Sequence, residues 1–77
     1  MADLDPVEVN ARNLLCPLPV IRTQNAVEDL PNGARVVVYC TDPGALNDIP
    51  AWCRVHGHTL LAQCQDGDDY LFTVKKQ

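Results

Sequence analysis

A cysteine stands directly before two prolines in the stretch Leu14–Pro19, which reads Leu-Leu-Cys-Pro-Leu-Pro. Proline is well tolerated in the first turn of a helix, because its missing N–H would have had no intrahelical partner there. An apolar pattern with helical spacing follows at once, so we expect Cys16 at a helix N-terminus. Unpaired N–H groups and the helix dipole favour an anion at that position, and a thiolate is an anion. The stretch therefore predicts a thiol presented for chemistry.

The helix position activates this thiol only moderately. A free cysteine has a pKa of about 8.5, so roughly 3% of it is thiolate at pH 7. A helix N-terminus stabilises an exposed anion by about 0.3–1 kcal/mol, which is less than one pKa unit. Leu15 and Leu18 flank the Cys-Pro pair, and apolar surroundings oppose the thiolate.

The start of the helix can be placed in two ways. If Cys16 is the N-cap, the two prolines remove two of the first three helical N–H groups, and the N–H of Leu18 is the only early donor left for the sulfur. If the helix begins at Leu18 or Pro19, Cys16 lies on a rigid extended segment just ahead of it, because a residue before proline avoids helical angles. Both placements give a stiff, exposed cysteine.

The absence of a second cysteine close to Cys16 in the sequence limits the reactions that this thiol could perform. Pro19 stands at the i+3 position, where a C-x-x-C redox pair would place its second thiol. A lone reactive thiol is suited to a carrier, which accepts a group such as sulfur in a persulfide and gives it to a partner. Two alternatives remain open: a thiol-redox module in which Cys53 pairs with Cys16, and an interaction module in which Cys16 only caps a helix.

The charged candidates have ordinary structural roles as their first interpretation. We expect Asp42 and Asp48 to cap helices, and a role as an acid near Cys16 is the alternative. Arg12 and Arg22 would either place positive charge near the sulfur or simply be solvated.

The remaining cysteines and the histidines are also assigned structural roles. We expect Cys40, Cys53 and Cys64 to be small buried hydrophobes. No C-x₂-C pair is present, so we predict neither a metal site nor a cofactor. His56 and His58 lie at a predicted helix end, where they would interact favourably with the helix C-terminus.

Length and charge limit the class of protein. The 77 residues are enough for one small domain, residues 1–77, with a loose terminus at residues 1–6. Six basic and ten acidic residues give a net charge of −4, which argues against nucleic-acid binding and favours protein partners. No signal peptide or membrane-spanning run is recognisable, so we expect a reduced, cytoplasmic chain, and we expect a monomer.

Hydrophobic periodicity predicts six elements in the order β-α-β-α-β-β. In chain order they are a strand Val7–Asn10 with Val7 and Val9 facing the core, a helix Pro17–Leu30, an interior strand Arg35–Cys40, a helix Leu46–His56, and strands Thr59–Gln65 and Asp69–Lys75.

Two further details follow from the pattern. Pro50 lies inside the second helical pattern and favours a helix that begins with Asp48 as its cap over a kinked longer helix. In the third strand we expect Leu60, Ala62 and Cys64 on one face, and an Asp-Gly hairpin turn at 65–68 leads to the last strand.

These elements predict an α+β fold. It is a two-layer α/β sandwich, with a four-stranded mixed sheet and two helices on one face. The helix-free face would carry Glu8, Gln63 and Thr73. The order of the strands in the sheet is not determined by the sequence.

The chain resembles the TusA/SirA-like family of small sulfur-carrier proteins from Val9 to Lys75. The residues that carry the resemblance are, in order, Asn10–Pro19 with the Cys-Pro-x-Pro string, Pro31–Gly33, Thr41–Pro43, Asp48–Pro50 and Gly57–Leu60. Family members commonly have Asp in place of Asn10, Gly in place of Asn13, and often a charged residue near the cysteine.

The resemblance implies the same β-α-β-α-β-β sandwich and a specific role for Cys16. By it, Cys16 carries a persulfide received from a cysteine desulfurase or a rhodanese-like donor and passes the sulfur to an acceptor protein. Pro17, Leu18 and Pro19 support this residue as parts of the motif. The resemblance implies a carrier without independent turnover rather than an enzyme. Routes in the family end in tRNA thiolation, molybdenum-cofactor supply or sulfur oxidation.

Overall fold

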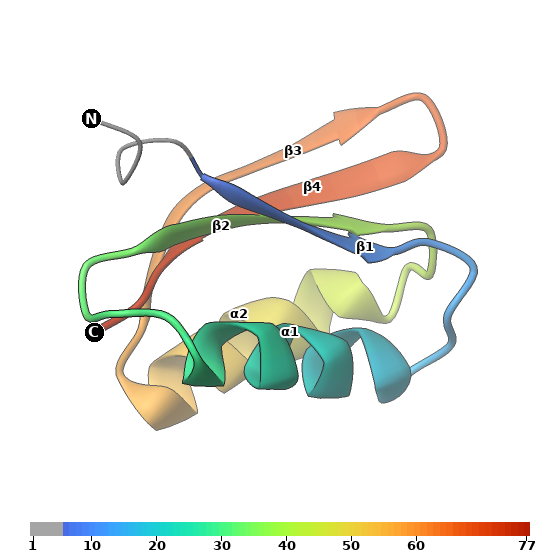
Figure 1. Cartoon of the computed structure of the whole chain (residues 1–77). Coiled ribbons are helices and arrows are strands. Elements are labelled where there is room, and N and C mark those ends of the chain that lie inside the picture. The colour runs from blue at the N-terminus through green and yellow to red at the C-terminus, as the bar shows by residue number, and fades with distance from the viewer. Residues whose placement is uncertain (1–5) are drawn as a thin grey trace.

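The computed structural model describes residues 6–77 of the chain, and the predicted loose terminus lies outside this range except for Pro6, which is exposed. Six elements follow in the predicted order (Figure 1). They are β1 Val7–Ala11, α1 Leu18–Glu28, β2 Arg35–Cys40, α2 Ala45–His56, β3 Thr59–Asp66 and β4 Asp69–Lys75. Both helices cover one face of a four-stranded mixed sheet, which confirms the predicted α+β sandwich.

The strands lie in the order β1-β2-β4-β3. β1 and β2 are parallel, whereas β4 is antiparallel to both of its neighbours. β2 is therefore an interior strand, as its continuous apolar run predicts. Because β1 and β2 are parallel, their carboxyl ends meet at one edge of the molecule. The loops to the two helices leave the sheet from this edge.

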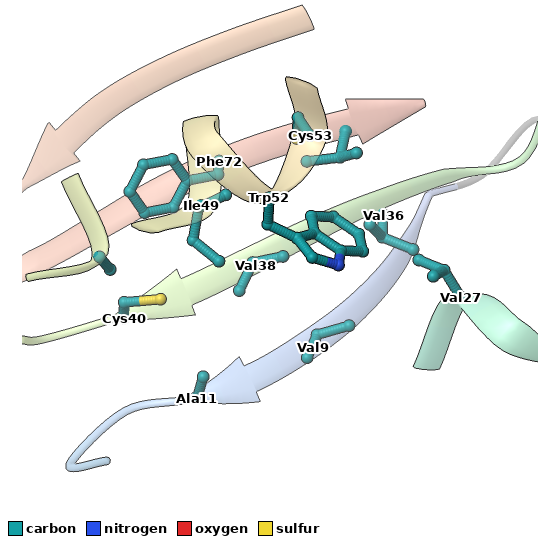
Figure 2. Close-up of a cluster of buried hydrophobic side chains, with 12 residues drawn as sticks. Val9, Ala11, Val27, Val36, Val38, Cys40, Ile49, Trp52, Cys53 and Phe72 are labelled. Atoms are coloured by element: carbon teal, nitrogen blue, oxygen red, sulfur yellow. The ribbon is translucent and has the colours of Figure 1, made fainter. Parts of the chain in front are cut away.

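The core lies between the sheet and the helices, and alternate strand residues point into it (Figure 2). β1 contributes Val9 and Ala11, and Val7, which pairs with the buried Val36, lies on the same face, as predicted, but is 41% exposed at the strand's beginning. The indole Nε1 of Trp52 donates to Gln24 Oε1 at 2.8 Å and joins α2 to α1. The other buried apolar residues include Val27, Val36, Val38, Cys40, Ala45, Ile49, Cys53, Phe72 and Val74.

α2 begins earlier than predicted and contains Pro50 in its interior. Gly44 is its N-cap residue, without a side-chain capping bond, so the predicted start at Asp48 is wrong. The longer helix buries Ala45 and Ile49 on its first turns, at 1% and 0% exposure. This burial outweighs the one backbone hydrogen bond that proline cannot donate.

β3 is an edge strand, and its burial differs from the prediction. A bulge between Leu60 and Ala62 reverses the alternation of side chains. Leu60 pairs with Val74 and packs against the core, whereas Cys64 pairs with Leu71 on the opposite face and is exposed. The predicted shared face of Leu60, Ala62 and Cys64 is therefore wrong, because the sequence did not reveal the bulge. The predicted burial of Cys64 is also wrong, because the sequence did not reveal that β3 lies at the edge of the sheet.

The helix-free face of the sheet contains Glu8 and Thr73, as predicted. Their register through Val37 places the three residues on one face. Gln63 pairs with the buried Phe72 and therefore lies on the helix side, contrary to the prediction. The same bulge accounts for this change of face.

Candidate functional site

Cys16 lies where the carboxyl ends of β1 and β2 meet the beginnings of α1 and α2 (Figure 1). Residues 12–17 connect β1 to α1, and residues 41–44 connect β2 to α2. The two helices run in the same direction, so both N-termini face this edge. Crossover connections between parallel strands produce this arrangement, and it is a common location for functional groups in α/β folds. Cys16 is exposed there.

The backbone around Cys16 follows the second of the two predicted placements. α1 begins at Leu18, and Pro17 is its N-cap residue, without a side-chain capping bond. The N–H of Leu18 donates to the carbonyl of Leu15 at 2.9 Å and not to the sulfur. The peptide bond between Cys16 and Pro17 is cis. Cys16 therefore precedes the helix and does not cap it.

Asp42 and Asp48 both contact Cys16. The backbone N–H of Cys16 donates to Asp42 Oδ2 at 2.9 Å, and its thiol donates to Asp48 Oδ2. The predicted capping roles of these acids are wrong, because α2 has no side-chain cap and Asp48 lies within the helix. The alternative, that an acid lies near the sulfur, is the one that the structure shows.

Gly44 is packed closely against this arrangement. A Cβ atom at Gly44 would lie 3.1 Å from Asp42 Oδ2 and 3.5 Å from the Cβ atom of Cys16. The first distance is shorter than an ordinary van der Waals contact, so a larger residue would press on the Asp42 carboxylate. The absence of a side chain at this position leaves room for Asp42 beside Cys16.

The two carboxylates raise the pKa of the Cys16 thiol above its ordinary value. The largest cause is the hydrogen bond to Asp48, followed by desolvation and then by the negative charges of Asp48 and Asp42. This direction is opposite to the effect of a helix N-terminus, which lowers a thiol pKa. A full charge in hydrogen-bonding contact outweighs the partial charge of a helix end, which is about +0.5 in total.

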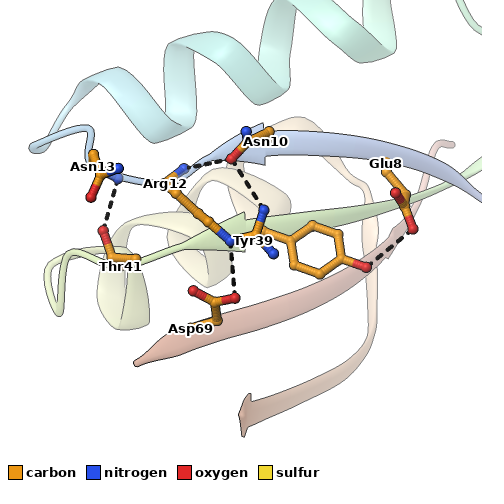
Figure 3. A network of polar contacts seen from close by, with 7 residues as sticks. All are labelled: Glu8, Asn10, Arg12, Asn13, Tyr39, Thr41 and Asp69. Atoms are coloured by element: carbon orange, nitrogen blue, oxygen red, sulfur yellow. Dashed lines mark hydrogen bonds and ion pairs between the residues drawn. The ribbon is translucent and has the colours of Figure 1, made fainter. Parts of the chain in front are cut away.

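Arg12 does not reach the sulfur. Its Nε donates to Asp69 Oδ2 at 2.9 Å, and its guanidinium lies 4.4 Å from the ring centroid of Tyr39 (Figure 3). Tyr39 Oη in turn donates to Glu8 at 3.2 Å on the same helix-free face. Arg12 therefore belongs to a polar network on the sheet.

Arg22 extends toward β1 instead of toward the thiol. Its Nη1 donates to the carbonyl of Asn10 at 3.2 Å. Within residues 6–77, no recorded hydrogen bond or ion pair joins Arg12 or Arg22 to Cys16. The alternative that these arginines place charge at the sulfur is not supported by their contacts.

Asn13 links the two loops of the site. Its backbone N–H donates to Thr41 Oγ1 at 2.8 Å, which is drawn in Figure 3. Asn13 has φ = 64°, in the left-handed region that favours glycine and that Asn tolerates better than most residues. Asn13 is therefore compatible with this backbone, although the resemblance described above leads us to expect Gly at this position.

An apolar surface surrounds the beginning of α1. Leu15 is 72% exposed, and Leu18 and Ile21 are each 48% exposed. Beside them lies a hollow of about 410 Å³ lined by Leu14, Leu18, Ile21, Arg22 and Asn25. The two leucines next to the Cys-Pro pair predicted an apolar surface here, but nothing in their spacing predicted the hollow.

The other cysteines are free thiols. Cys40 and Cys53 are buried in the core, at 0% and 2% exposure, as predicted. Among the described residues no cluster of three or more His, Cys, Asp or Glu side chains could hold a metal ion. None of the helices in residues 6–77 has the length and apolar character needed to cross a membrane.

Known proteins are similar to this chain in sequence and in fold. The family model described as "Sulfurtransferase TusA" matches residues 7–76. A putative sulfur carrier protein YrkI of Bacillus subtilis is 41% identical over 68 residues, covering 88% of this chain and 91% of the relative. The sulfur carrier protein TusA of Allochromatium vinosum is 34% identical over 76 residues and covers 99% of both chains.

A solved structure agrees with this assignment at the level of the fold. The SirA-like protein of Desulfitobacterium hafniense superposes with a TM-score of 0.80 at 21% identity, covering 90% of this chain and 95% of the other. Its two-layer fold is the one described above. With the family model matching nearly the whole described chain and relatives of 34–41% identity, the protein belongs to the TusA family.

Proposed function

We propose that this protein is a sulfur carrier in which Cys16 holds sulfane sulfur as a persulfide. The observation that carries the proposal is the position of Cys16. It is an exposed cysteine on a short segment fixed by its contacts with Asp42 and Asp48, directly before the prolines of the motif. The relatives named sulfur carrier protein support the same role.

The transfer is an exchange between a thiol and a persulfide, and it needs no external oxidant. The Cys16 thiolate attacks the outer sulfur of a donor persulfide, R–S–SH. The S–S bond of the donor breaks and a new S–S bond forms on Cys16. The donor leaves as a thiolate and takes up the proton that Cys16 released. Delivery to an acceptor thiol repeats these steps with Cys16 as the leaving group.

The proposed donor is a cysteine desulfurase or a rhodanese-like protein, and the acceptor is another protein of a sulfur-relay route. That route would be tRNA thiolation, molybdenum-cofactor supply or sulfur oxidation. We propose the cytoplasm as the compartment, because thiols are kept reduced there. As a carrier of one sulfur atom, the protein has no independent turnover, and it requires neither a cofactor nor direct contact with nucleic acid.

The donor is proposed to dock on the apolar surface at the beginning of α1. Sulfur exchange requires the two sulfur atoms to touch, so the donor must cover the surface next to Cys16. Leu15, Leu18 and Ile21 are the large exposed apolar residues of this surface. The hollow beside them offers a recess for an apolar side chain of the donor. Leu18 belongs to the motif, and Pro17 and Pro19 hold it in place in the first turn of α1.

Two alternatives have less support. A redox module would need Cys53 as the second thiol, but Cys53 is 2% exposed in the core, whereas Cys16 is exposed. An interaction module in which Cys16 only caps a helix would need a capping bond that α1 lacks.

The experiment is sulfur loading followed by intact-mass measurement. The protein is incubated with a cysteine desulfurase and free cysteine, and the expected product is heavier by about 32 Da, one sulfur atom. The Cys16→Ser variant is expected to gain no adduct, while Cys64→Ser, which removes the other exposed thiol, is expected to load normally. An unchanged adduct in Cys16→Ser would refute the proposal.

A further inference from the structure

The contacts of Cys16 fix both its backbone and its proton. Asp42 accepts the backbone N–H at 2.9 Å, which anchors the residue from the β2–α2 loop. Asp48, from within α2, accepts the thiol hydrogen. A thiol can donate this hydrogen bond only while it carries its proton, so the contact selects the protonated state.

The charged groups around the sulfur also favour the protonated thiol. α1 has no acidic residue in its first turn, and its Arg22 is directed to the carbonyl of Asn10. From the β1–α1 loop, Arg12 is held by Asp69. This ion pair involves neither Asp42 nor Asp48, and the negative charges of both carboxylates raise the pKa of the Cys16 thiol.

We propose that Asp48 is a positioning residue that holds the empty carrier as a protonated, oriented thiol and so restrains its reaction with small electrophiles and oxidants. The inference deepens the proposed function, because an exposed single thiol that must remain available for sulfur is also open to oxidation. Only the thiolate reacts with these agents, and a thiol whose proton is held by a carboxylate forms less of it.

Asp48 and Asp42 differ in how they act. Asp48 bonds the proton that is lost on ionisation, whereas Asp42 bonds the backbone and contributes only its charge to the sulfur. The raised pKa of Cys16 has the hydrogen bond to Asp48 as its largest cause and the charge of Asp42 as its smallest, which agrees with this difference.

The test is the pH dependence of Cys16 alkylation by iodoacetamide, followed by peptide mass spectrometry. In Asp48→Asn we expect the rate–pH curve to move to lower pH, with alkylation near pH 7.5 faster by about three- to tenfold. Asp42→Asn is expected to move the curve less, and Asp48→Glu, which keeps the charge, less than Asp48→Asn. Cys64 in the same sample is the internal reference and should not change.

A measurement on the unaltered chain keeps the inference testable if a variant fails to fold. The midpoint of Cys16 alkylation in the native protein is expected at higher pH than in the same protein unfolded in concentrated urea. A native midpoint at lower pH, or an Asp48→Asn curve that coincides with that of the unaltered chain, would overturn the inference. Because alkylation requires no sulfur donor, these outcomes are independent of whether Cys16 loads sulfur.

Discussion

The reactivity of Cys16 depends on two opposing influences that are both local. The beginnings of α1 and α2 contribute partial positive charge, but Pro17 and Pro19 supply no N–H groups to α1, and the N–H of Leu18 is taken by Leu15. Asp48 opposes this with a full charge in direct contact with the thiol. The sequence predicted an exposed thiol before a helix correctly, but it predicted the wrong direction of its pKa shift.

Cys40 is expected to make the stability of the protein sensitive to alkali. Its side chain is fully buried, and burial raises its pKa from 9.0 to about 11. Between these values the unfolded chain loses the thiol proton while the folded chain keeps it. The free energy of unfolding therefore falls as pH rises, by at most about 1.4 kcal/mol per pH unit for one thiol. Well below pH 9 both states keep the proton, and Cys40 contributes no pH dependence.

Urea unfolding followed by Trp52 fluorescence, from about pH 8 to about pH 10.5, measures this effect. Cys40→Ala is expected to be less stable at every pH because it leaves a small cavity. Its stability should nevertheless decline less steeply above pH 9. Cys53, whose pKa burial also raises, accounts for part of the remaining slope. If the free energy of unfolding declined equally steeply with pH in Cys40→Ala and in the unaltered chain, Cys40 would not be the source of the sensitivity to alkali.

At the scale of elements, α2 shows how burial outweighs local preference. Pro50 predicted a helix beginning at Asp48, but Ala45 and Ile49 extend it to an earlier start because both fit into the core. The earlier start matters for the site. Asp48 lies within α2 and does not cap it, and its side chain contacts Cys16. Local helix signals could not reveal this, because the decisive contacts are made with the sheet.

Replacing Pro50 with Ala is expected to stabilise the protein by about 1 kcal/mol, because it restores one backbone N–H donor within α2. The midpoint of urea unfolding measures the change. Pro43→Ala is the matched control. Pro43 precedes the helix and is exposed, so its replacement should leave stability unchanged or slightly lower. A Pro50→Ala variant less stable than the unaltered chain would mean that the proline ring packs favourably enough to outweigh the missing bond.

At the scale of the whole molecule, the strand order brings the site together. Cys16 and Asp48 are far apart in sequence, and they meet because two parallel strands release their loops at the same edge. The order of elements and the two layers could be predicted from periodicity, but the order β1-β2-β4-β3 could not. The same limitation explains Cys64, whose exposure follows from the edge position and the bulge of β3.

The apolar surface beside Cys16 gives a prediction about the encounter with the donor. Leu18→Asp is expected to slow sulfur loading by about tenfold or more, which corresponds to the loss of roughly 1.4 kcal/mol of contact. Val55→Asp is the matched control, because Val55 is 79% exposed in the last turn of α2, at the other end of the helix layer (Figure 1). Equal loading rates for the two variants would exclude this surface as the docking site.

The most direct test of the account is the position of the transferred sulfur in the unaltered chain. After loading and alkylation, trypsin would release the exposed thiols on separate peptides, Cys16 on residues 13–22 and Cys64 on residues 55–75, with Cys40 and Cys53 together on residues 36–54. We expect the additional mass of about 32 Da on the peptide with Cys16. Sulfur found only on another of these peptides, or on none, would contradict it.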